Sequence, residues 1–168
     1  MKADYVWLNG ELMPFKQANV PFLSPTMHYG LGVFEGIRCY ETSGGAAVFR
    51  LSEHLQRLLD SALIFGIRDF PYTLQELREA TLETIRANGF NSCYIRPLIY
   101  LDGPLGLNLD AAEPRIGIAA WEWGAYLGEE ALETGVHMMV SSFTRHHINA
   151  SMTKAKISGN YVNSVLAK

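Results

Sequence analysis

Lys156 is the residue whose surroundings best suit covalent chemistry. It lies beside the small residues Ala155 and Gly159 and is followed by Tyr161. Small neighbours let a planar cofactor approach the backbone, and an unprotonated amine can attack a carbonyl carbon to form an imine. A free lysine has a pKa of about 10.4, so this role requires burial or a neighbouring cation. On this segment alone, the alternative is that Lys154 and Lys156 are two solvated lysines of a loop.

Three arginines stand in sequence surroundings where a charge is unexpected. Arg38 and Arg96 lie within apolar strand-like runs, and Arg57 lies on a predicted helix. A half-buried arginine is costly without an anionic partner, because its charge cannot be removed by deprotonation. The partner is either an internal Asp or Glu, or the carboxylate or phosphate of a ligand. The pattern leaves both possibilities open for each arginine.

Composition excludes several classes of function. The chain has 168 residues, of which 48% are hydrophobic and 18% charged, with a net charge of −3. These values predict a soluble globular protein with no electrostatic footprint for nucleic acid. The apolar runs are too short for a membrane span, and the start of the chain lacks a signal peptide, so we expect a cytoplasmic protein. Cys39 and Cys93 are far apart and are expected to be small buried residues.

The familiar motifs for metals and nucleotides are missing from the sequence. The five histidines show no ligand spacing with cysteines or carboxylates, so we predict no metal site. Neither Gly30 to Gly32 nor Gly103 to Gly106 matches a dinucleotide or phosphate-loop pattern, and no Gly-x-Ser-x-Gly elbow occurs. Lys156 and the three arginines therefore remain as the candidates for chemistry.

Turn signals and alternating residues predict most of the strands. The dipeptide Asn9-Gly10 predicts a hairpin, since it tolerates the positive φ angles of a tight turn. Residues 33–40 form a predicted strand with Phe34 and Arg38 on the same face. The remaining strands are predicted over residues 5–8, 11–13, 47–50, 92–101, 116–123 and 136–143.

Two helices are predicted between the early and late strands. Ser52 is a suitable N-cap for a helix that ends at Gly66. Thr73 and Glu76 form a capping-box pattern at the start of a second helix, which Asn88-Gly89 would stop. Strands on both sides of a helical pair indicate an α+β fold with a mostly antiparallel sheet, and not a doubly wound parallel sheet.

The chain is expected to contain one domain and the start of another. We predict an amino-terminal α+β domain over residues 1–143, an interdomain loop over 144–152 and the truncated start of a second domain over 153–168, with a helix from Asn160. The loop of residues 102–114 is long enough to suggest a binding role.

Several short motifs together carry a resemblance to a known family. They are Met27–Gly30, Val33–Arg38, Glu53–Leu58, Tyr94–Pro97, Trp123–Gly128 and Lys156–Tyr161, in this order along the chain. The sequence resembles the branched-chain amino acid aminotransferases of the class IV fold, which depend on pyridoxal 5'-phosphate (PLP). The resemblance implies the transfer of an amino group between branched-chain L-amino acids and 2-oxoglutarate.

The resemblance also implies roles for individual residues. Lys156 would form the Schiff base with PLP and move the proton at the substrate Cα. Arg57 would hold the PLP phosphate, and Tyr161 would hydrogen-bond the phenolate oxygen of the cofactor. Arg96 would meet the distal carboxylate of glutamate. Arg38 would either support other pocket residues or contact the substrate directly.

An apolar substrate pocket and a dimer are implied as well. The predicted wall of the pocket consists of Tyr29, Phe34, Tyr94, Trp123 and Tyr126. In the family, the loop that corresponds to residues 103–108 reaches the site of the neighbouring subunit, so Leu105 and Leu107 are expected contacts in trans. A homodimer, or a higher homo-oligomer, would be the active form.

Length separates this chain from typical family members, which are close to twice as long. The other half supplies the acidic partner of the pyridine nitrogen, so the sequence is expected to be a fragment of a larger enzyme. D-amino acid aminotransferases and aminodeoxychorismate lyases of the same fold remain alternatives for the activity. A catalytically silent domain that self-associates is the alternative from another class.

Overall fold

The computed structural model describes residues 3–124, 128 and 130–168, which form an α+β fold around one antiparallel sheet. Within these residues the sheet has seven strands in the order β2-β1-β7-β6-β4-β5, and β3 pairs with β6 beside β4. The strands are β1 (Tyr5–Leu8), β2 (Glu11–Pro14), β3 (Gly32–Phe34), β4 (Ile37–Thr42), β5 (Gly45–Val48), β6 (Cys93–Asp102) and β7 (Glu113–Trp121). The predicted fold class is therefore confirmed.

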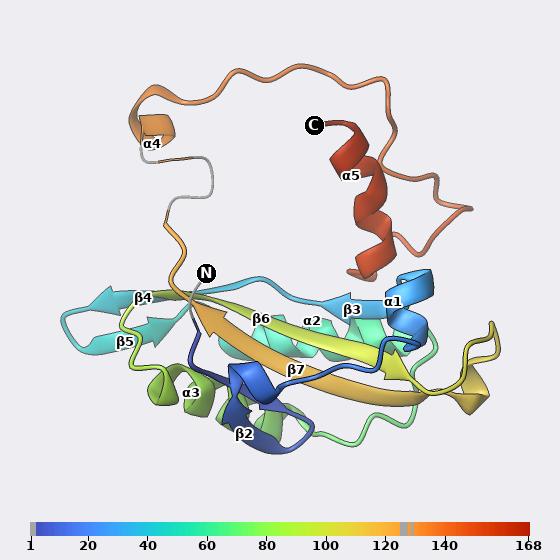
Figure 1. Ribbon diagram of the computed structural model, residues 1–168. Coiled ribbons are helices and arrows are strands. Elements are labelled where there is room, and N and C mark those ends of the chain that lie inside the picture. The colour runs from blue at the N-terminus through green and yellow to red at the C-terminus, as the bar shows by residue number, and fades with distance from the viewer. Residues whose placement is uncertain (1–2, 125–127, 129) are drawn as a thin grey trace.

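Two long helices pack against this sheet (Figure 1). Helix α2 contacts β3 and α3, and α3 lies on β1, β6 and β7. The helices are α1 (Pro25–Tyr29), α2 (Leu51–Ile64), α3 (Leu74–Ala87), α4 (Glu130–Thr134) and α5 (Val162–Leu166), with 3-10 turns at Phe15–Gln17, Leu109–Ala111 and Ser158–Tyr161. Among the described helices, none has the length and apolar character that crossing a membrane would require.

Local sequence signals explain the ends of several elements. Asn9 and Gly10 both have positive φ angles, 51° and 102°, as the predicted tight hairpin turn requires. The capping box of α3 is present, since the Thr73 side chain accepts from the backbone of Glu76 and the Glu76 carboxylate accepts from that of Thr73. The predicted N-cap of α2 is wrong. The helix begins at Leu51, and Arg50 caps it with a φ angle of 49°.

The predicted strand of residues 33–40 is interrupted where it faces Pro97. In the register of β3 and β4 against β6, Glu35 and Gly36 lie opposite Pro97 and Arg96. Proline has no N–H group and cannot complete the ladder. The Glu35 amide still donates to the Pro97 carbonyl at 3.0 Å, so the chain continues along the edge of β6. The alternation of faces also continues, with Val33, Glu35 and Ile37 buried.

The strand predicted over residues 136–143 is wrong. Met138, Met139 and Val140 are 89 to 95% exposed, and no described strand pairs with them. Alternating apolar residues form a strand only where a partner supplies the ladder. Near Asn160, where the sequence predicts a short helix, α5 follows a 3-10 turn. The division into residues 1–143, 144–152 and 153–168 stays a prediction.

The core between sheet and helices contains both cysteines. Cys39 and Cys93 face each other across β4 and β6, each is 1% exposed, and both are free thiols. Burial raises the pKa of each, that of Cys93 to about 12, so both thiols remain protonated at neutral pH. The expectation that they are small buried residues is confirmed.

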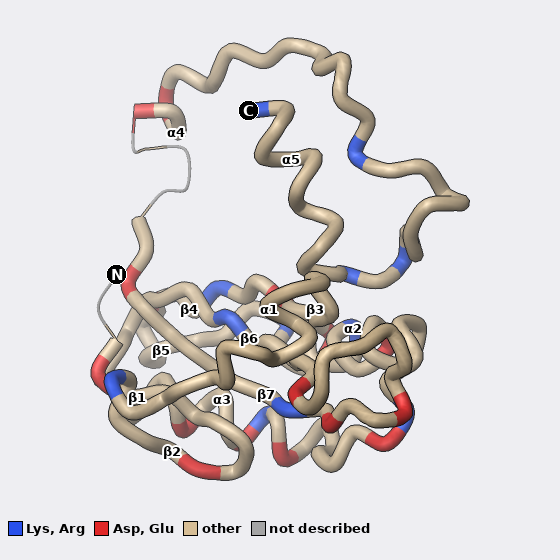
Figure 2. Tube along the Cα trace, turned by 45° about the vertical axis from the view of Figure 1, so that its right-hand side comes forward, with Lys and Arg blue, Asp and Glu red and all other residues tan. Residues whose placement is uncertain are grey.

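Charge is distributed unevenly along the chain (Figure 2). Residues 135–168 contain Arg145, Lys154, Lys156 and Lys168 but no Asp or Glu. In Figure 1 this segment arches away from the sheet and returns above β3 and α1. Its return brings basic side chains next to the sheet.

Candidate active site

The backbone of Lys156 is held between strand β3 and helix α2. The Phe34 amide donates to the Lys156 carbonyl at 3.1 Å, and Val33 forms an isolated antiparallel bridge with Ile157. The Lys156 amide donates to Oγ of Ser61 on α2, also at 3.1 Å. These bonds order the backbone at Lys156, so its side chain starts from a defined position.

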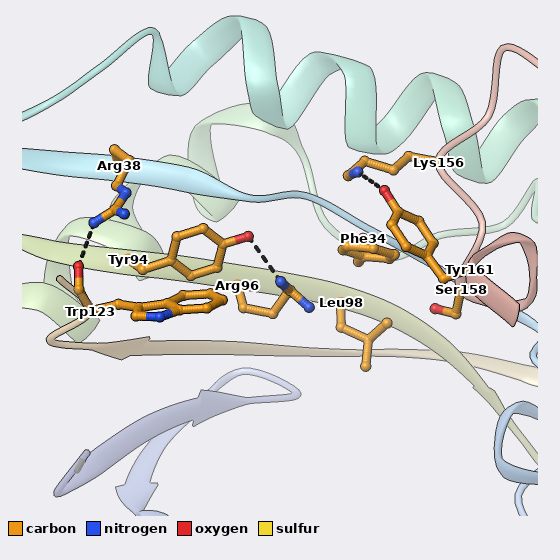
Figure 3. A pocket seen from close by; sticks show the side chains of 9 residues that line it. All are labelled: Phe34, Arg38, Tyr94, Arg96, Leu98, Trp123, Lys156, Ser158 and Tyr161. Carbon is orange, nitrogen blue, oxygen red and sulfur yellow. Dashed lines mark hydrogen bonds between the residues drawn. The ribbon is translucent and has the colours of Figure 1, made fainter. Parts of the chain in front are cut away.

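The amine of Lys156 meets two aromatic residues. Its Nζ donates a hydrogen bond to the Tyr161 hydroxyl and lies 4.6 Å from the centre of the Phe34 ring. The Phe34 and Tyr161 rings are themselves 5.1 Å apart. In Figure 3 the amine lies above Phe34 and points to the Tyr161 hydroxyl. A phenol hydroxyl that accepts a hydrogen bond from an amine fixes the direction in which the amine points.

A cavity of about 640 Å³ opens beside this amine (Figure 3). Aromatic and aliphatic side chains form much of its wall, and three basic side chains reach it. It is lined by Phe34, Arg38, Tyr94, Arg96, Leu98, Trp123, Lys156, Ser158 and Tyr161. Among the described residues no Asp or Glu lines this cavity, so it suits a small molecule with an apolar part and an anionic part.

Arg38 fastens the chain that follows β7. Its Nη1 donates to the Trp123 carbonyl at 2.5 Å, and its Nη2 donates to the Gly124 carbonyl at 3.0 Å. The Trp123 ring then lies 4.8 Å from the Tyr94 ring in an edge contact. Arg38 thus has backbone oxygens as partners. The two roles considered for it, support of other pocket residues and direct contact with the substrate, stay predictions.

Arg96 lies between two aromatic rings. Its guanidinium carbon is 4.6 Å from the centre of the Phe34 ring and 5.2 Å from that of Tyr94, and its Nη2 donates to the Tyr94 hydroxyl at 2.9 Å. Its Nε is buried without a hydrogen-bond partner. Among the described residues no carboxylate pairs with Arg96. The cation therefore retains unused capacity to bind an anion.

Arg57 pairs with an internal acid, one of the two kinds of partner that the sequence left open for each arginine. Its Nε and Nη2 donate to the two carboxylate oxygens of Glu35, at 2.5 and 2.7 Å, and His54 Nδ1 lies 2.9 Å from the same carboxylate. Burial acts to raise the pKa of Glu35, but the hydrogen bonds and charges of Arg57 and His54 outweigh it and hold the pKa below 4.5. Glu35 is therefore ionised at neutral pH.

Lys156 also borders a second cavity, of about 430 Å³. Basic and hydroxyl side chains are common in its wall, and within the part of the chain that the structure describes no acidic residue lines it. It is lined by Arg57, Arg145, Thr153, Lys154, Ala155, Lys156, Tyr161 and Ser164. Lys156 and Tyr161 border both cavities. A cationic cavity of this kind suits a phosphate or another multivalent anion.

Two glycines permit the close packing around these cavities. A side chain at Gly36 would collide with the Tyr94 hydroxyl, which Arg96 holds in place. Gly30 has a φ angle of 70°, and a Cβ on it would lie 2.9 Å from the Cα of Gly159. The end of α1 can therefore approach the segment that follows Lys156 this closely only because residue 30 is a glycine.

The structure gathers most, but not all, of the predicted site residues. Phe34, Arg38, Tyr94, Arg96, Trp123, Lys156 and Tyr161 line the first cavity, and Arg57, Lys156 and Tyr161 line the second. Tyr29 is outside both linings and is 45% exposed at the end of α1. Leu107 is 83% exposed on its loop, and Leu105 is also exposed, so neither reaches these cavities within its own chain. Tyr126 lies outside the described residues.

Sequence reasoning missed several residues of this region, including Leu98, Ser158 and Glu35. Leu98 could have been found, because it follows Tyr94 and Arg96 on the same face of β6 with a period of two. Ser158 lies next to the lysine segment and lines the first cavity. Glu35 carried a signal too, since an acid between Phe34 and Gly36 in an apolar run needs a cationic partner.

Comparison with known proteins agrees with this architecture. The family model for amino-transferase class IV matches residues 32–168, which is most of the chain and includes every residue that lines either cavity. The chain belongs to the class IV aminotransferase family.

Individual members of the family are closely similar to it. The chain is 48% identical over 163 residues to a branched-chain-amino-acid aminotransferase of Pseudomonas aeruginosa and 49% identical over 169 residues to that of Escherichia coli. These alignments cover 96% and 98% of the chain but 53% and 54% of the relatives, so the chain spans about half the length of the relatives.

Solved structures of such enzymes are similar as well. A branched-chain amino acid aminotransferase with pyridoxamine 5'-phosphate superposes with a TM-score of 0.93 at 48% identity, and the match covers 100% of this chain and 55% of the solved one. The Escherichia coli branched-chain amino acid aminotransferase superposes with a TM-score of 0.92 at 47% identity, over 98% of this chain and 55% of the solved one.

Proposed function

We propose that the protein containing this chain is a branched-chain amino acid transaminase. It would move an amino group between leucine, isoleucine or valine and 2-oxoglutarate with PLP as its cofactor. Support comes from the family membership, from relatives that carry this name and from a similar structure with pyridoxamine 5'-phosphate. The cytoplasmic location expected from the sequence stays a prediction.

One observation supports the proposal most directly: Lys156 borders both a cationic cavity and an aromatic one. Transamination through a lysine requires a bound aldehyde cofactor on one side and a bound amino acid on the other. The cavity with Arg57 suits the phosphate end of a cofactor, and the cavity with Arg96 and Phe34 suits the substrate. The side chain of Lys156 is common to both.

The residues of the second cavity fit PLP. Its wall is basic, with no acidic side chain among the described residues that line it, and Lys156 and Tyr161, which hydrogen-bond each other, both border it. We therefore assign Arg57 to the phosphate, with Lys156 as the attachment point and Tyr161 beside the ring. When bound, PLP supplies an electron-accepting ring that stabilises the charge left at the substrate Cα.

Lys156 and Tyr161 would move protons in this site. With substrate bound, the Lys156 amine would remove the Cα proton, and the Tyr161 hydroxyl, which accepts a hydrogen bond from that amine, would orient it. The Phe34 ring, 4.6 Å from the amine, would cover one side of it. A correctly placed general base contributes about 10²- to 10⁴-fold to the rate.

The first cavity would accommodate two kinds of side chain. Phe34, Tyr94 and Trp123 offer apolar surface to a branched aliphatic group, and burying such a group is worth about 1.5 to 3 kcal/mol. Arg96 would pair with the distal carboxylate in the half-reaction of glutamate. Arg38 would act through Trp123, whose backbone it holds.

We also propose that the active form is a homodimer or a higher homo-oligomer. The exposure of Leu105 and Leu107 on the loop before β7 leaves them available for a contact in trans. Tyr29 would complete the pocket from α1, and Tyr126 from the chain after β7. These assignments rest on the family resemblance.

Replacing the lysine tests the proposed function. In the intact protein that contains this chain, Lys156→Ala should lower kcat for L-leucine with 2-oxoglutarate by about 10²- to 10⁴-fold, since the general base is lost. Borohydride should fix PLP on Lys156 in the unmodified protein, as peptide mapping can detect. Lys16→Ala, in an exposed 3-10 turn far from both cavities in sequence, serves as the control and should keep full activity.

The same assay separates the alternatives. Activity with D-alanine or aminodeoxychorismate, but not with L-leucine, would assign the protein to another activity of the family. Absence of a borohydride-fixed cofactor in the intact protein would favour a catalytically silent domain.

A further inference from the structure

Glu35 is a fully buried carboxylate beside the proposed cofactor site. Its side chain has no solvent exposure. Its Oε1 accepts from Arg57 Nε, and its Oε2 accepts from Arg57 Nη2 and from the Gly36 amide at 3.3 Å, with His54 Nδ1 at 2.9 Å. A carboxylate with this many donors is fixed in orientation. The groups that it binds are fixed with it.

Both partners of Glu35 come from the same face of α2. His54 and Arg57 are three residues apart on this helix and therefore neighbours on its surface. Glu35 approaches them from the sheet, because the Pro97 carbonyl holds its amide and its side chain points to the helix side of the strand. The network thus joins the sheet to α2 next to the lysine segment.

The ion pair between Glu35 and Arg57 is asymmetric. Glu35 is buried, whereas the Arg57 side chain is 55% exposed and lines the cationic cavity. The pair uses Nε and Nη2, and among the described residues no hydrogen bond engages Nη1. If the ion pair only stabilised the core, Arg57 would have no need to border a cavity. Its position there indicates a further partner for the guanidinium.

We propose that Glu35 is a positioning residue that holds the Arg57 guanidinium ready for the phosphate of the cofactor. The inference rests on the proposed function, since it concerns the same site. A free arginine side chain loses rotamer entropy when it binds an anion, and a bidentate carboxylate removes that cost in advance. The negative charge of Glu35 opposes the phosphate, but Arg145, Lys154 and Lys156 keep the cavity cationic.

The test compares PLP with pyridoxal, which lacks the phosphate. In the intact protein, Glu35→Gln keeps the shape of the side chain but loses the charge that binds both nitrogens of Arg57. We expect the affinity for PLP to fall about tenfold, the loss of about one charge-assisted hydrogen bond, and the affinity for pyridoxal to change less than twofold. Glu53→Gln is the matched control, an exposed glutamate of α2 that pairs with Arg50 and should change neither affinity.

A measurement on the unmodified protein covers the case in which Glu35→Gln does not fold. Nitrogen-15 NMR of the cofactor-free protein should give an Arg57 Nε–H signal that exchanges at least tenfold more slowly than that of exposed Arg68. Arg57→Lys assigns the signal by its loss. Equal exchange rates for the two arginines would mean that the guanidinium is not held in advance.

Different results would contradict the assigned phosphate site and the positioning role of Glu35. If the unmodified protein does not prefer PLP to pyridoxal, or if Arg57→Met leaves that preference unchanged, the assigned phosphate site is wrong. If the preference depends on Arg57 but Glu35→Gln leaves it unchanged or increases it, only the positioning role is wrong. An equal loss for PLP and pyridoxal would indicate a purely structural residue.

Discussion

Arg38 and Arg96 line the same cavity, but their partners differ. The two terminal nitrogens of Arg38 are engaged by the backbone carbonyls of Trp123 and Gly124. Arg96 has one hydroxyl, two aromatic faces and an unpaired Nε. Arg96 is therefore the better candidate to recognise a carboxylate, and Arg38 the better candidate to preserve the shape of the cavity.

Removing the charge of Arg96 should lower kcat/KM for L-glutamate much more than kcat/KM for L-leucine. In Arg96→Met, we expect kcat/KM for L-glutamate to fall by about 30-fold or more, because a desolvated charge pair is worth about 2 kcal/mol or more. The value for L-leucine should fall less than fivefold, since methionine retains apolar volume. Single-turnover kinetics with each amino acid would measure both values.

Arg115→Met is the matched control, because Arg115 lies on neighbouring β7 and pairs with exposed Glu113. Equal losses for the two substrates in Arg96→Met would contradict recognition of the carboxylate by this arginine.

Residue types alone predict part of the site. Lys156 and the three arginines stand out in the sequence because buried or crowded cations need partners. The identity of each partner is not predictable in this way, because it depends on contacts between distant segments. Arg57 meets Glu35 and also borders a cavity, so its pairing with an internal acid leaves the binding of a ligand anion as a prediction.

At the scale of elements, the contact between Gly30 and Gly159 joins α1 to the lysine segment. Gly30→Ala should destabilise the protein by about 1 to 2 kcal/mol from its left-handed backbone alone, and further from the close contact with Gly159. The displaced segment begins shortly after Lys156, so kcat should also fall by about tenfold, as expected for misplacement of a catalytic group. Urea unfolding and steady-state kinetics would measure the two effects.

Gly89→Ala provides the control for this prediction. Gly89 has nearly the same φ angle, 68°, but a Cβ there meets nothing within 4 Å. The Gly89→Ala variant should therefore lose stability only through its left-handed backbone, and its kcat should be unchanged. Equal kinetic effects for the two variants would show that the contact with Gly159 is unimportant for the site.

Elements defined by local signals are predicted well. The Asn9-Gly10 turn and the capping box of α3 depend on neighbouring residues only, and both are present. Elements that depend on distant partners are predicted less well. Pro97 interrupts the strand opposite it, and residues 136–143 have no described strand beside them. The local sequence pattern predicts neither of these features, because each depends on a segment distant in the sequence.

At the scale of the whole molecule, carboxylates link stability to pH. The hydrogen bonds and charges of Arg57 and His54 outweigh burial and lower the pKa of Glu35, and hydrogen bonds lower the pKa values of Glu53 and Glu76. A group whose pKa is lower when folded stabilises the protein above its unfolded value, and this contribution is lost as pH falls through the folded value. We therefore expect the free energy of unfolding to decrease below about pH 4.5.

Urea unfolding of the intact protein between about pH 3.5 and 6.5 would measure this dependence. Glu35→Gln should show a shallower decrease on the acid side, because one of the carboxylates that become protonated is missing. A slope identical to that of the unmodified protein would mean that the pKa of Glu35 is the same in the folded and unfolded chain.

The pairing of β1 with β7 determines when the sheet can be completed during translation. Trp7 pairs with Ile118, so the amino-terminal hairpin leaves the ribosome long before its partner strand has been synthesised. Such non-local pairing slows folding, and an unpaired strand edge can template association between nascent chains. Because β1 has only four residues, its unpaired edge is short, and this limits association between nascent chains until β7 has been synthesised.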